Sequence, residues 1–287
     1  SLDLRPDYDL GIMQEGQSLY DVAQGCLQGL GGVVGEYRPD LLLAQGDTAT
    51  VFLSSLVAFF EKIRVGHVEA GLRSGDKWAP FPEEIFRRLT DVLTDLHFAP
   101  THSAREKLLA EGFDPSHVYV TGNTVVDSLM RIASVEGKVE APLLRSILED
   151  EDSRLVMLTA HRRESFGSPL RDIFCAVRKL VDDHGDVRLL YPVHPNPNVV
   201  EPAQELLSNH PRIDLVEPLG YRDLVLALKG AHLVLTDSGG IQEEAAALNK
   251  PLLVTRRVTE RPEAVDSGCA RLVGVGTETI FNAAHEL

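Results

Sequence analysis

Short apolar runs alternate along the chain with longer amphipathic stretches. The runs are rich in leucine and β-branched residues, and they are bounded by polar or turn-forming residues. Such a rhythm is typical of parallel strands joined by crossover helices, so the sequence predicts an α/β fold. The predicted strands are Leu41–Ala44, Arg64–Val68, His97–Ala99, Val118–Val120, Val156–Thr159, Val187–Pro192, Ile213–Val216, Leu233–Thr236 and Leu252–Thr255.

The strand rhythm lapses once, in a polar and acidic stretch between residues 129 and 154. This stretch, LMRIASVEGKVEAPLLRSILEDEDSR, contains no strand candidate but can carry a helix. We therefore predict a first domain over residues 1–128, a linker region over 129–154 and a second domain over 155–287. No internal repeat of a solenoid or propeller period is present.

Composition and charge narrow the possible partners. With 287 residues, of which 44% are hydrophobic and 25% charged, the chain is long enough for two domains with separate cores. Its net charge of -15 and the absence of a dense Lys/Arg run argue against binding to nucleic acid or to an anionic membrane. An anionic ligand would need a local pocket.

The cysteines and the apolar segments indicate a cytoplasmic protein. Cys26, Cys175 and Cys269 are odd in number and far apart, which disfavours a disulfide framework and a structural zinc site. The longest apolar stretch, Val51–Phe60, is far shorter than the roughly 20 residues that span a bilayer. No signal peptide is visible.

Polar residues follow the predicted strands. In open parallel sheets, ligands bind outside the carboxyl ends of the strands. The residues at these positions are Gly46-Asp47-Thr48, Glu69-Ala70-Gly71, His161-Arg162-Arg163-Glu164, His194 and Asp237-Ser238-Gly239-Gly240. We expect the functional groups of the protein to lie there.

The segment TDSGGIQEE predicts a phosphate-binding turn at the start of a helix. Gly239 and Gly240 let a ligand approach the backbone, and the free N–H groups of a helix N-terminus favour an anion. Glu244, one turn further on, can accept hydrogen bonds from a ribose diol. The alternative is a simple capped helix with Ser238 as its N-cap.

Acidic residues gather in the segment GHVEAGLRSGDKWAPFPEEIFRR. Carboxylates on one loop can supply a proton donor and a proton acceptor if their environments separate their pKa values. The alternatives are a solvated loop before a helix that begins near Pro82 and, for Asp47, a simple N-cap. The charged residues of this segment include Glu69, Asp76, Glu83 and Glu84 with Arg73, Arg87 and Arg88.

Two histidines also follow strands. His161, beside Arg162 and Arg163, can contact a diphosphate or move a proton, although a plain surface loop is the alternative. His194 stands in YPVHPNPN, where the prolines can instead make a rigid turn. The histidines are too scattered for a metal site, and HExxH is absent.

Eight strings in order resemble the non-hydrolysing UDP-N-acetylglucosamine 2-epimerases over nearly the whole chain. The strings are GDT, HVEAGLRSGD, PFPEEIFRRLTD, TGNTVVD, TAHRRESFG, YPVHPNPNV, TDSGGIQEE and VTERPEAV. The resemblance implies two Rossmann-like domains in the GT-B arrangement with the substrate in an interdomain cleft. It also implies interconversion of UDP-N-acetylglucosamine and UDP-N-acetylmannosamine for cell-surface polysaccharide synthesis, and a homodimer.

The chemistry that this family uses is elimination and re-addition of UDP. It requires no NAD or other cofactor, which fits the absence of GxGxxG after any strand. By resemblance, the acidic catalytic set falls on Asp47, Glu69 and Glu83 and the active-site histidine on His161. The nucleotide contacts fall on Arg87, Ser238, Gly239, Gly240 and Glu244, and a second, activating substrate site on Arg162 and His194.

Two departures from the family pattern stand out. The usual PEEANR-type string reads PEEIFR, which places Ile85 and Phe86 where small or polar residues are usual. The family also begins with a strand and a GTRPE-type turn carrying an Arg and a Lys, and it ends with helices beyond this chain. We therefore expect the chain to be a fragment of a longer protein or a degenerate relative.

Three other functions fit parts of the pattern. A hydrolysing 2-epimerase, which releases N-acetylmannosamine and UDP, would use the same motifs. A catalytically silent module would bind the UDP-sugar without turnover. A glycosyltransferase fits the fold, since architecture does not fix chemistry, but HVEAG and PFPEE disfavour it.

Overall fold

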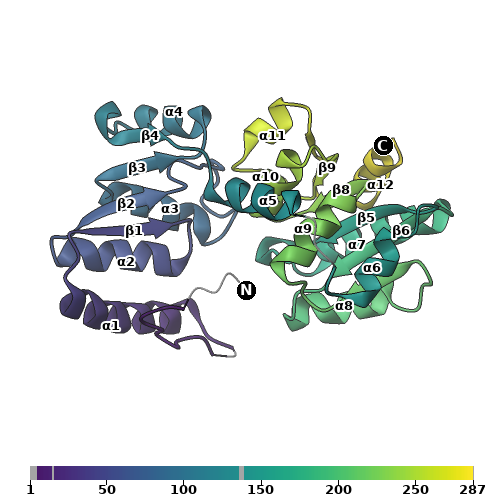
Figure 1. Ribbon diagram of the computed structural model, residues 1–287, viewed down its shortest axis with the longest axis horizontal. Helices are drawn as coiled ribbons and strands as arrows, with labels where there is room; N and C mark the ends of the chain where they lie inside the picture. Colours follow the sequence, from purple (N-terminus) through teal and green to yellow (C-terminus); the bar gives the residue numbers. More distant parts are fainter. Residues whose placement is uncertain (1–4, 15, 136–138, 287) are drawn as a thin grey trace. The chain divides into compact units, whose positions relative to one another are not determined.

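The computed structural model describes residues 5–14, 16–135 and 139–286, which form two compact units, residues 1–123 and 124–287 (Figure 1). Each unit contains one parallel sheet, in agreement with the predicted α/β fold. The candidate functional residues are described unit by unit below.

The first unit has a four-stranded sheet in the order β1-β2-β3-β4, with every pair parallel. Its register places His67 of β2 beside Ala44 of β1 and His97 of β3. The elements are α1 (Leu19–Tyr37), β1 (Leu41–Gln45), α2 (Ala49–Phe60), β2 (Arg64–Val68), α3 (Glu83–Leu93), β3 (Leu96–Ala99), α4 (His102–Ala110), a 3-10 turn η1 (Pro115–His117) and β4 (Val118–Val120).

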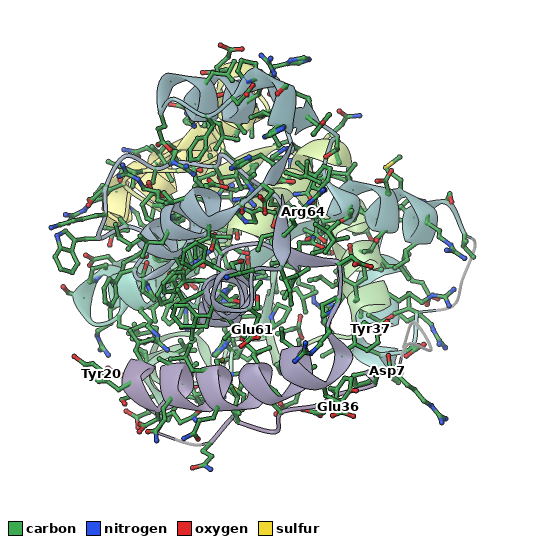
Figure 2. The ribbon with its side chains drawn as sticks, turned by 90° about the vertical axis from the view of Figure 1, so that its left-hand side faces the viewer. Asp7, Tyr20, Glu36, Tyr37, Glu61 and Arg64 are labelled. Carbon is green, nitrogen blue, oxygen red and sulfur yellow. The ribbon has the colours of Figure 1, made fainter. Side chains whose placement is uncertain are left out.

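Helix α1 packs against α2, and Figure 2 shows α1 from the side across the lower part of the view. Ser18 and Asp21 form a capping box at its start, in which each side chain satisfies a backbone N–H of the other residue. Its outer face carries Tyr20 and Tyr37, which are 87% and 71% exposed.

None of the helices in the described residues is long and apolar enough to cross a membrane.

The second unit has a six-stranded parallel sheet in the order β10-β9-β8-β5-β6-β7. The chain reverses its direction of growth between β5 and β8, which is the topological switch point where doubly wound sheets bind ligands. The elements are α5 (Thr124–Ser134), α6 (Pro142–Leu148), β5 (Arg154–Thr159), a 3-10 turn η2 (Arg163–Ser165), α7 (Ser168–Asp183), β6 (Val187–Pro192), α8 (Pro197–Leu207), β7 (Ile213–Val216), α9 (Tyr221–Gly230), β8 (Leu233–Thr236), α10 (Gly239–Ala247), β9 (Leu252–Val254), α11 (Pro262–Asp266), β10 (Ala270–Leu272) and α12 (Thr277–His285).

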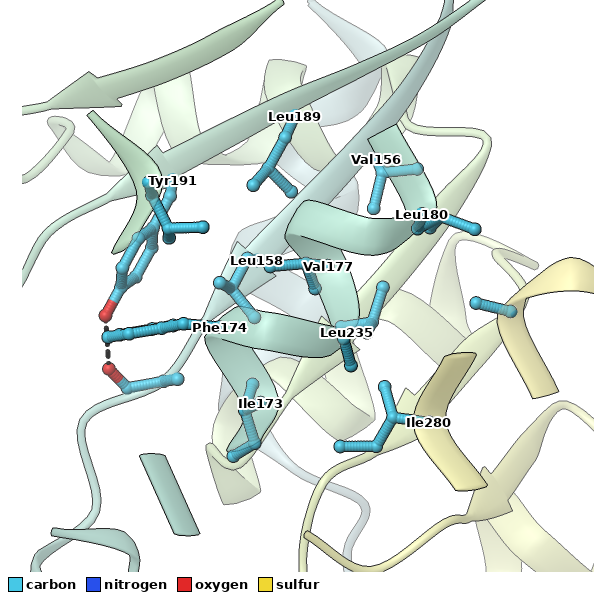
Figure 3. Packing of buried hydrophobic residues seen from close by; sticks show 14 of the residues in the cluster. Val156, Leu158, Ile173, Phe174, Val177, Leu180, Leu189, Tyr191, Leu235 and Ile280 are labelled. Atoms are coloured by element: carbon cyan, nitrogen blue, oxygen red, sulfur yellow. Dashed lines mark hydrogen bonds between the residues drawn. The ribbon is translucent and has the colours of Figure 1, made fainter. Parts of the chain in front are cut away.

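Both faces of this second sheet are buried. Along β5, Val156 and Leu158 face α7 and α12, whereas Leu155 and Met157 face the opposite side, toward α6 and α9. Figure 3 shows the first of these cores, including Tyr191, whose hydroxyl donates a 2.6 Å hydrogen bond to the Ala160 carbonyl. Burial on both faces explains why the strands read as continuous apolar runs rather than alternating ones.

Each of the predicted strands is present, with ends shifted by no more than two residues. The strand that the sequence reading missed is β10, Ala270–Leu272. It is three residues long, contains Arg271 and lies at the edge of the sheet, so it lacks the continuous apolar pattern of the inner strands.

The predicted linker over residues 129–154 differs from the observed division, which falls between Asn123 and Thr124. The stretch contains the C-terminal half of α5 and the whole of α6, and both helices belong to the second unit. Leu129 of α5 is fully buried, and Leu144 and Ile147 of α6 join the second core of that unit. These apolar positions were not recognised in the sequence, because they are isolated at helical spacing among exposed charged residues.

We predict that the central core of the second unit tolerates truncation poorly. Leu235→Ala on β8 removes a fully buried side chain and should lower the free energy of unfolding by about 2 to 5 kcal/mol. Leu143→Ala on α6, where the side chain is 42% exposed, is the matched control and should cost less than about 1 kcal/mol. Urea denaturation monitored by circular dichroism measures both. Equal losses would contradict this placement of the core.

Candidate active-site residues

Asp47 follows β1 and forms an ion pair with Arg87 of α3. The Arg87 Nη2 and Asp47 Oδ2 atoms are 2.5 Å apart, and Arg87 Nη1 lies 3.0 Å from Glu84 Oε2. Arg87 is 1% exposed, so it needs both carboxylates to compensate its buried charge. The N-cap of α2 is Thr48, and the N-cap reading of Asp47 is therefore wrong.

Glu69 follows β2 in a strained backbone conformation. Its φ of 71° lies in the left-handed region, which is uncommon for a residue with a side chain. The conformation is held by two hydrogen bonds, from the Glu69 and Ala70 N–H groups to the Phe98 carbonyl. The Asn123 amide donates a 2.7 Å hydrogen bond to Glu69 Oε1, which fixes the direction of the carboxylate.

Glu83 and Glu84 open α3, where negative charge is stabilised by the positive end of the helix dipole. Glu84 is buried and accepts hydrogen bonds from the Ser74 and Gly75 N–H groups. These hydrogen bonds hold the loop that precedes α3 against the start of the helix. Glu83 keeps its expected place at the first position of the helix. The unusual Phe86 stacks on Phe52 of α2 with ring centroids 5.6 Å apart, which explains how the PEEIFR string packs.

In the second unit, Asp237 joins the ends of β5 and β8 at the switch point. Its Oδ2 atom accepts hydrogen bonds from the N–H groups of His161 and Arg162, each 2.8 Å long. Its Oδ1 atom lies 3.7 Å from His161 Nδ1. The carboxylate is fully buried, so these contacts hold the His161 loop and the Ser238 turn together.

The predicted phosphate-binding turn begins α10 directly after β8. Ser238 is the N-cap residue, but its hydroxyl makes no capping hydrogen bond; instead, its N–H donates to Thr236 Oγ1 over 2.9 Å. A Cβ atom on Gly239 would lie 2.4 Å from Glu260 Oε1 and 2.7 Å from Arg261 Nη1, whereas one on Gly240 would meet nothing within 4 Å. The turn thus has a crowded side and an open side.

Glu244 is buried one turn into α10 and accepts a 2.8 Å hydrogen bond from the Tyr221 hydroxyl. Burial raises the pKa of Glu244, although the hydrogen bond from Tyr221 works in the opposite direction. A carboxylate held in this way retains one oxygen for a further donor, such as a ribose hydroxyl.

His161 and His194 are brought together, with stacked rings whose centroids are 5.4 Å apart. Burial lowers the pKa of His161 despite the nearby charge of Asp237, so the ring is neutral at pH 7 and able to accept a proton. His194 is exposed, and its Nδ1 atom accepts the Asn196 N–H. In the described ranges, no cluster of three or more His, Cys, Asp or Glu side chains is placed to hold a metal ion.

Comparison with known proteins decides the family. A family model described as UDP-N-acetylglucosamine 2-epimerase matches residues 1–287. The chain belongs to the UDP-N-acetylglucosamine 2-epimerase family. The Bacillus subtilis UDP-N-acetylglucosamine 2-epimerase is 44% identical over 284 residues, which covers 99% of this chain and 73% of the relative.

Solved structures of the epimerase family share the same fold. A Staphylococcus aureus MnaA–UDP complex is 45% identical with a TM-score of 0.93, covering 99% of this chain and 74% of that one. A Neisseria meningitidis UDP-GlcNAc 2-epimerase bound to UDP-GlcNAc is 41% identical with a TM-score of 0.92, covering 99% and 77%.

Three polar residues of the candidate site were given no individual role by the sequence analysis. Asn123 and Asp237 stand inside the quoted strings TGNTVVD and TDSGGIQEE, but neither was assigned a role. Tyr221, the partner of Glu244, follows a strand and a short loop without any motif. A buried polar residue directly after a strand was the available signal for Asp237.

We predict that replacing each glycine of the turn by alanine has different effects on stability, because Gly239 is on the crowded side and Gly240 on the open side. Gly239→Ala should lower both the melting temperature and the affinity for UDP, because Glu260 and Arg261 must move. Gly240→Ala should leave the melting temperature unchanged or higher, yet weaken UDP binding by about tenfold or more, because the methyl group occupies the phosphate side. Thermal unfolding and calorimetry measure the two quantities. Undiminished UDP affinity in the Gly240→Ala variant would contradict phosphate binding at this turn.

Proposed function

We propose that the chain interconverts UDP-N-acetylglucosamine and UDP-N-acetylmannosamine by inversion at C2, without hydrolysis. The observation that carries the proposal is the match of the whole chain to the epimerase family. The relatives bound to UDP or UDP-GlcNAc support the same ligand for this chain. The geometry of the residues at the strand ends of each unit supports the roles proposed below.

The chemical difficulty is the C2 proton of a pyranose, because no neighbouring carbonyl stabilises a carbanion there. Elimination avoids the carbanion: a base takes the C2 proton, a double bond forms between C1 and C2, and the C1–O bond breaks. UDP leaves with the electron pair and gives 2-acetamidoglucal. Re-addition of UDP at C1, with protonation of C2 from the opposite face, completes the inversion and consumes nothing.

The second unit holds the leaving nucleotide in this proposal. The N–H groups of Ser238, Gly239 and Gly240 bind the diphosphate, whose negative charge grows as the C1–O bond breaks. Glu244 accepts hydrogen bonds from the ribose. His161, neutral and fixed by Asp237, exchanges a proton with the departing phosphate.

The first unit supplies the proton transfers at C2. Removal and return on opposite faces require two separate groups, and Asp47, Glu69 and Glu83 are the candidates. The ion pair with Arg87 holds the Asp47 carboxylate in place. Glu69 is held in a strained conformation with its carboxylate oriented by Asn123, as expected for a reacting group.

Arg162 and His194 are proposed to bind a second, activating UDP-N-acetylglucosamine. His194 stacks on His161, so a ligand held by His194 would change the surroundings of the catalytic histidine directly.

The decisive test is incubation with UDP-N-acetylglucosamine in deuterated water followed by NMR of the sugar. We expect deuterium at C2 in a mixture of both UDP-sugar epimers, because each turnover exchanges the C2 proton with solvent. Release of free N-acetylmannosamine would instead identify a hydrolysing enzyme. UDP binding with no exchange at C2 would contradict the proposal and leave a binding module.

We predict that Glu69→Gln and Glu83→Gln each lower kcat by about 10²- to 10⁴-fold, since each removes a group that gains or loses a proton. The affinity for UDP should change by less than about threefold, because neither side chain is among the proposed nucleotide contacts. Glu106→Gln, at a side chain that is 69% exposed on α4, is the matched control and should retain activity. Normal turnover in both site variants would rule out the acidic assignment.

A further inference from the structure

A buried network of charges lies beneath the Asp47 and Glu69 turns, and the roles assigned above do not use it. His67 of β2, Arg73 of the loop between β2 and α3, and Asp91 of α3 are 0%, 8% and 0% exposed. Asp91 Oδ1 lies 2.6 Å from His67 Nδ1, and Asp91 Oδ2 lies 2.8 Å from Arg73 Nη2. The Gly71 N–H also donates to Asp91 Oδ2.

The second ring nitrogen of His67 reaches a different segment. His67 Nε2 lies 2.8 Å from the carbonyl oxygen of Gly46, the residue directly before Asp47. A carbonyl oxygen can only accept a hydrogen bond, and an ionised carboxylate can only accept one. Both ring nitrogens of His67 must therefore donate, and the ring carries a positive charge.

The surroundings of the ring agree with this charge. Burial disfavours the charged ring, but the hydrogen bond and charge of Asp91, the Gly46 carbonyl and the charge of Glu69 together raise the pKa of His67. Burial likewise opposes ionisation of Asp91, yet His67 and Arg73 lower the pKa of its carboxyl group. Arg73 is also ion-paired with Glu111, whose Oε2 atom lies 2.7 Å from Arg73 Nη2. His97 on β3 is a further titratable neighbour, where burial lowers the pKa and keeps the ring neutral.

The network joins the segments that carry the acidic candidates. Gly46 precedes Asp47, and a Cβ atom built on Gly46 would lie 3.5 Å from Glu69 Oε2. Asp91 stands on the same helix as Glu83, and it also holds the Gly71 N–H in the turn after Glu69. A change in the hydrogen bond to Gly46 therefore moves Asp47 relative to Glu69.

We propose that His67 is a positioning residue, kept as an imidazolium between Asp91 and Gly46, which fixes the Asp47 turn for proton transfer at C2. The catalytic part of this inference rests on the proposed function, whereas the protonation state does not. The pKa of His67 is higher in the folded chain than the value of about 6.5 in the unfolded chain. The two hydrogen bonds that the charged ring donates, to Asp91 and to Gly46, are therefore fully formed below about pH 6.5. They are lost as the pH rises through the pKa of the folded state.

The protonation state is tested on the whole chain labelled with ¹⁵N-histidine. Long-range ¹H–¹⁵N NMR at pH 7.5 should show both ring nitrogens of His67 protonated, and a neutral ring at His97 as the internal control. The ring signals of His67 are assigned as those that are absent from the spectrum of a His67→Gln variant. A neutral ring at His67 would overturn the proposal whether or not the chain is an active epimerase.

The positioning role is tested by kinetics on the same variant. His67→Gln should lower kcat by about 10- to 100-fold with KM and UDP affinity within about threefold, since misplacement of about 1 Å is enough for such a loss. The decline of wild-type kcat at basic pH that follows His67 titration should be absent from the variant. His97→Gln, a buried histidine at the neighbouring register position, should stay within about threefold. Unchanged kcat in folded His67→Gln would overturn the proposal, while an inactive wild-type chain would refute the proposed function instead.

Discussion

Charge that is buried at the carboxyl ends of the strands must be compensated, and this constraint shapes both units. An isolated ion costs several kcal/mol to remove from water, so each buried charge needs a partner of opposite sign or several hydrogen bonds. Arg87 lies between Asp47 and Glu84, and Arg256 between Glu164 and Glu260. The turns that carry the candidate site residues are therefore fixed by ion pairs as much as by apolar packing.

The buried carboxylate of Asp237 is compensated in the same way, and the strand order of the second unit makes this possible. In the second unit, β5 and β8 are neighbours at the switch point, so the carboxylate of Asp237 reaches the backbone of His161 and Arg162. The turn over residues 238–240 has an open side at Gly240, and crowding by Glu260 and Arg261 explains the glycine at position 239. In the proposed reaction, backbone N–H groups of this turn would stabilise the negative charge that develops on the leaving diphosphate.

The sequence predicted the inner strands well because apolar runs buried on both faces have few alternatives. It predicted the candidate residues because parallel strands align their carboxyl ends. It could not predict which side chains these residues contact. From the sequence, a helix cap was an equally good interpretation of Asp47, because its ion-pair partner Arg87 lies forty residues away along the chain. The acidic stretch over residues 129–154 was interpreted as a linker because the burial of Leu144 and Ile147 depends on contacts with distant strands. The roles of Asn123, Asp237 and His67 depend on tertiary contacts in the same way.

In the function proposed for this chain, inversion at C2 proceeds by departure and return of UDP. Substrate labelled with ¹⁸O in the oxygen that bridges C1 and the β-phosphate tests it most directly, with ³¹P NMR following the label during turnover. We expect the label to spread to the non-bridging positions of the β-phosphate, because the freed diphosphate terminus rotates before UDP adds back. Complete retention of the label in the bridge, while the two epimers interconvert, would contradict the account.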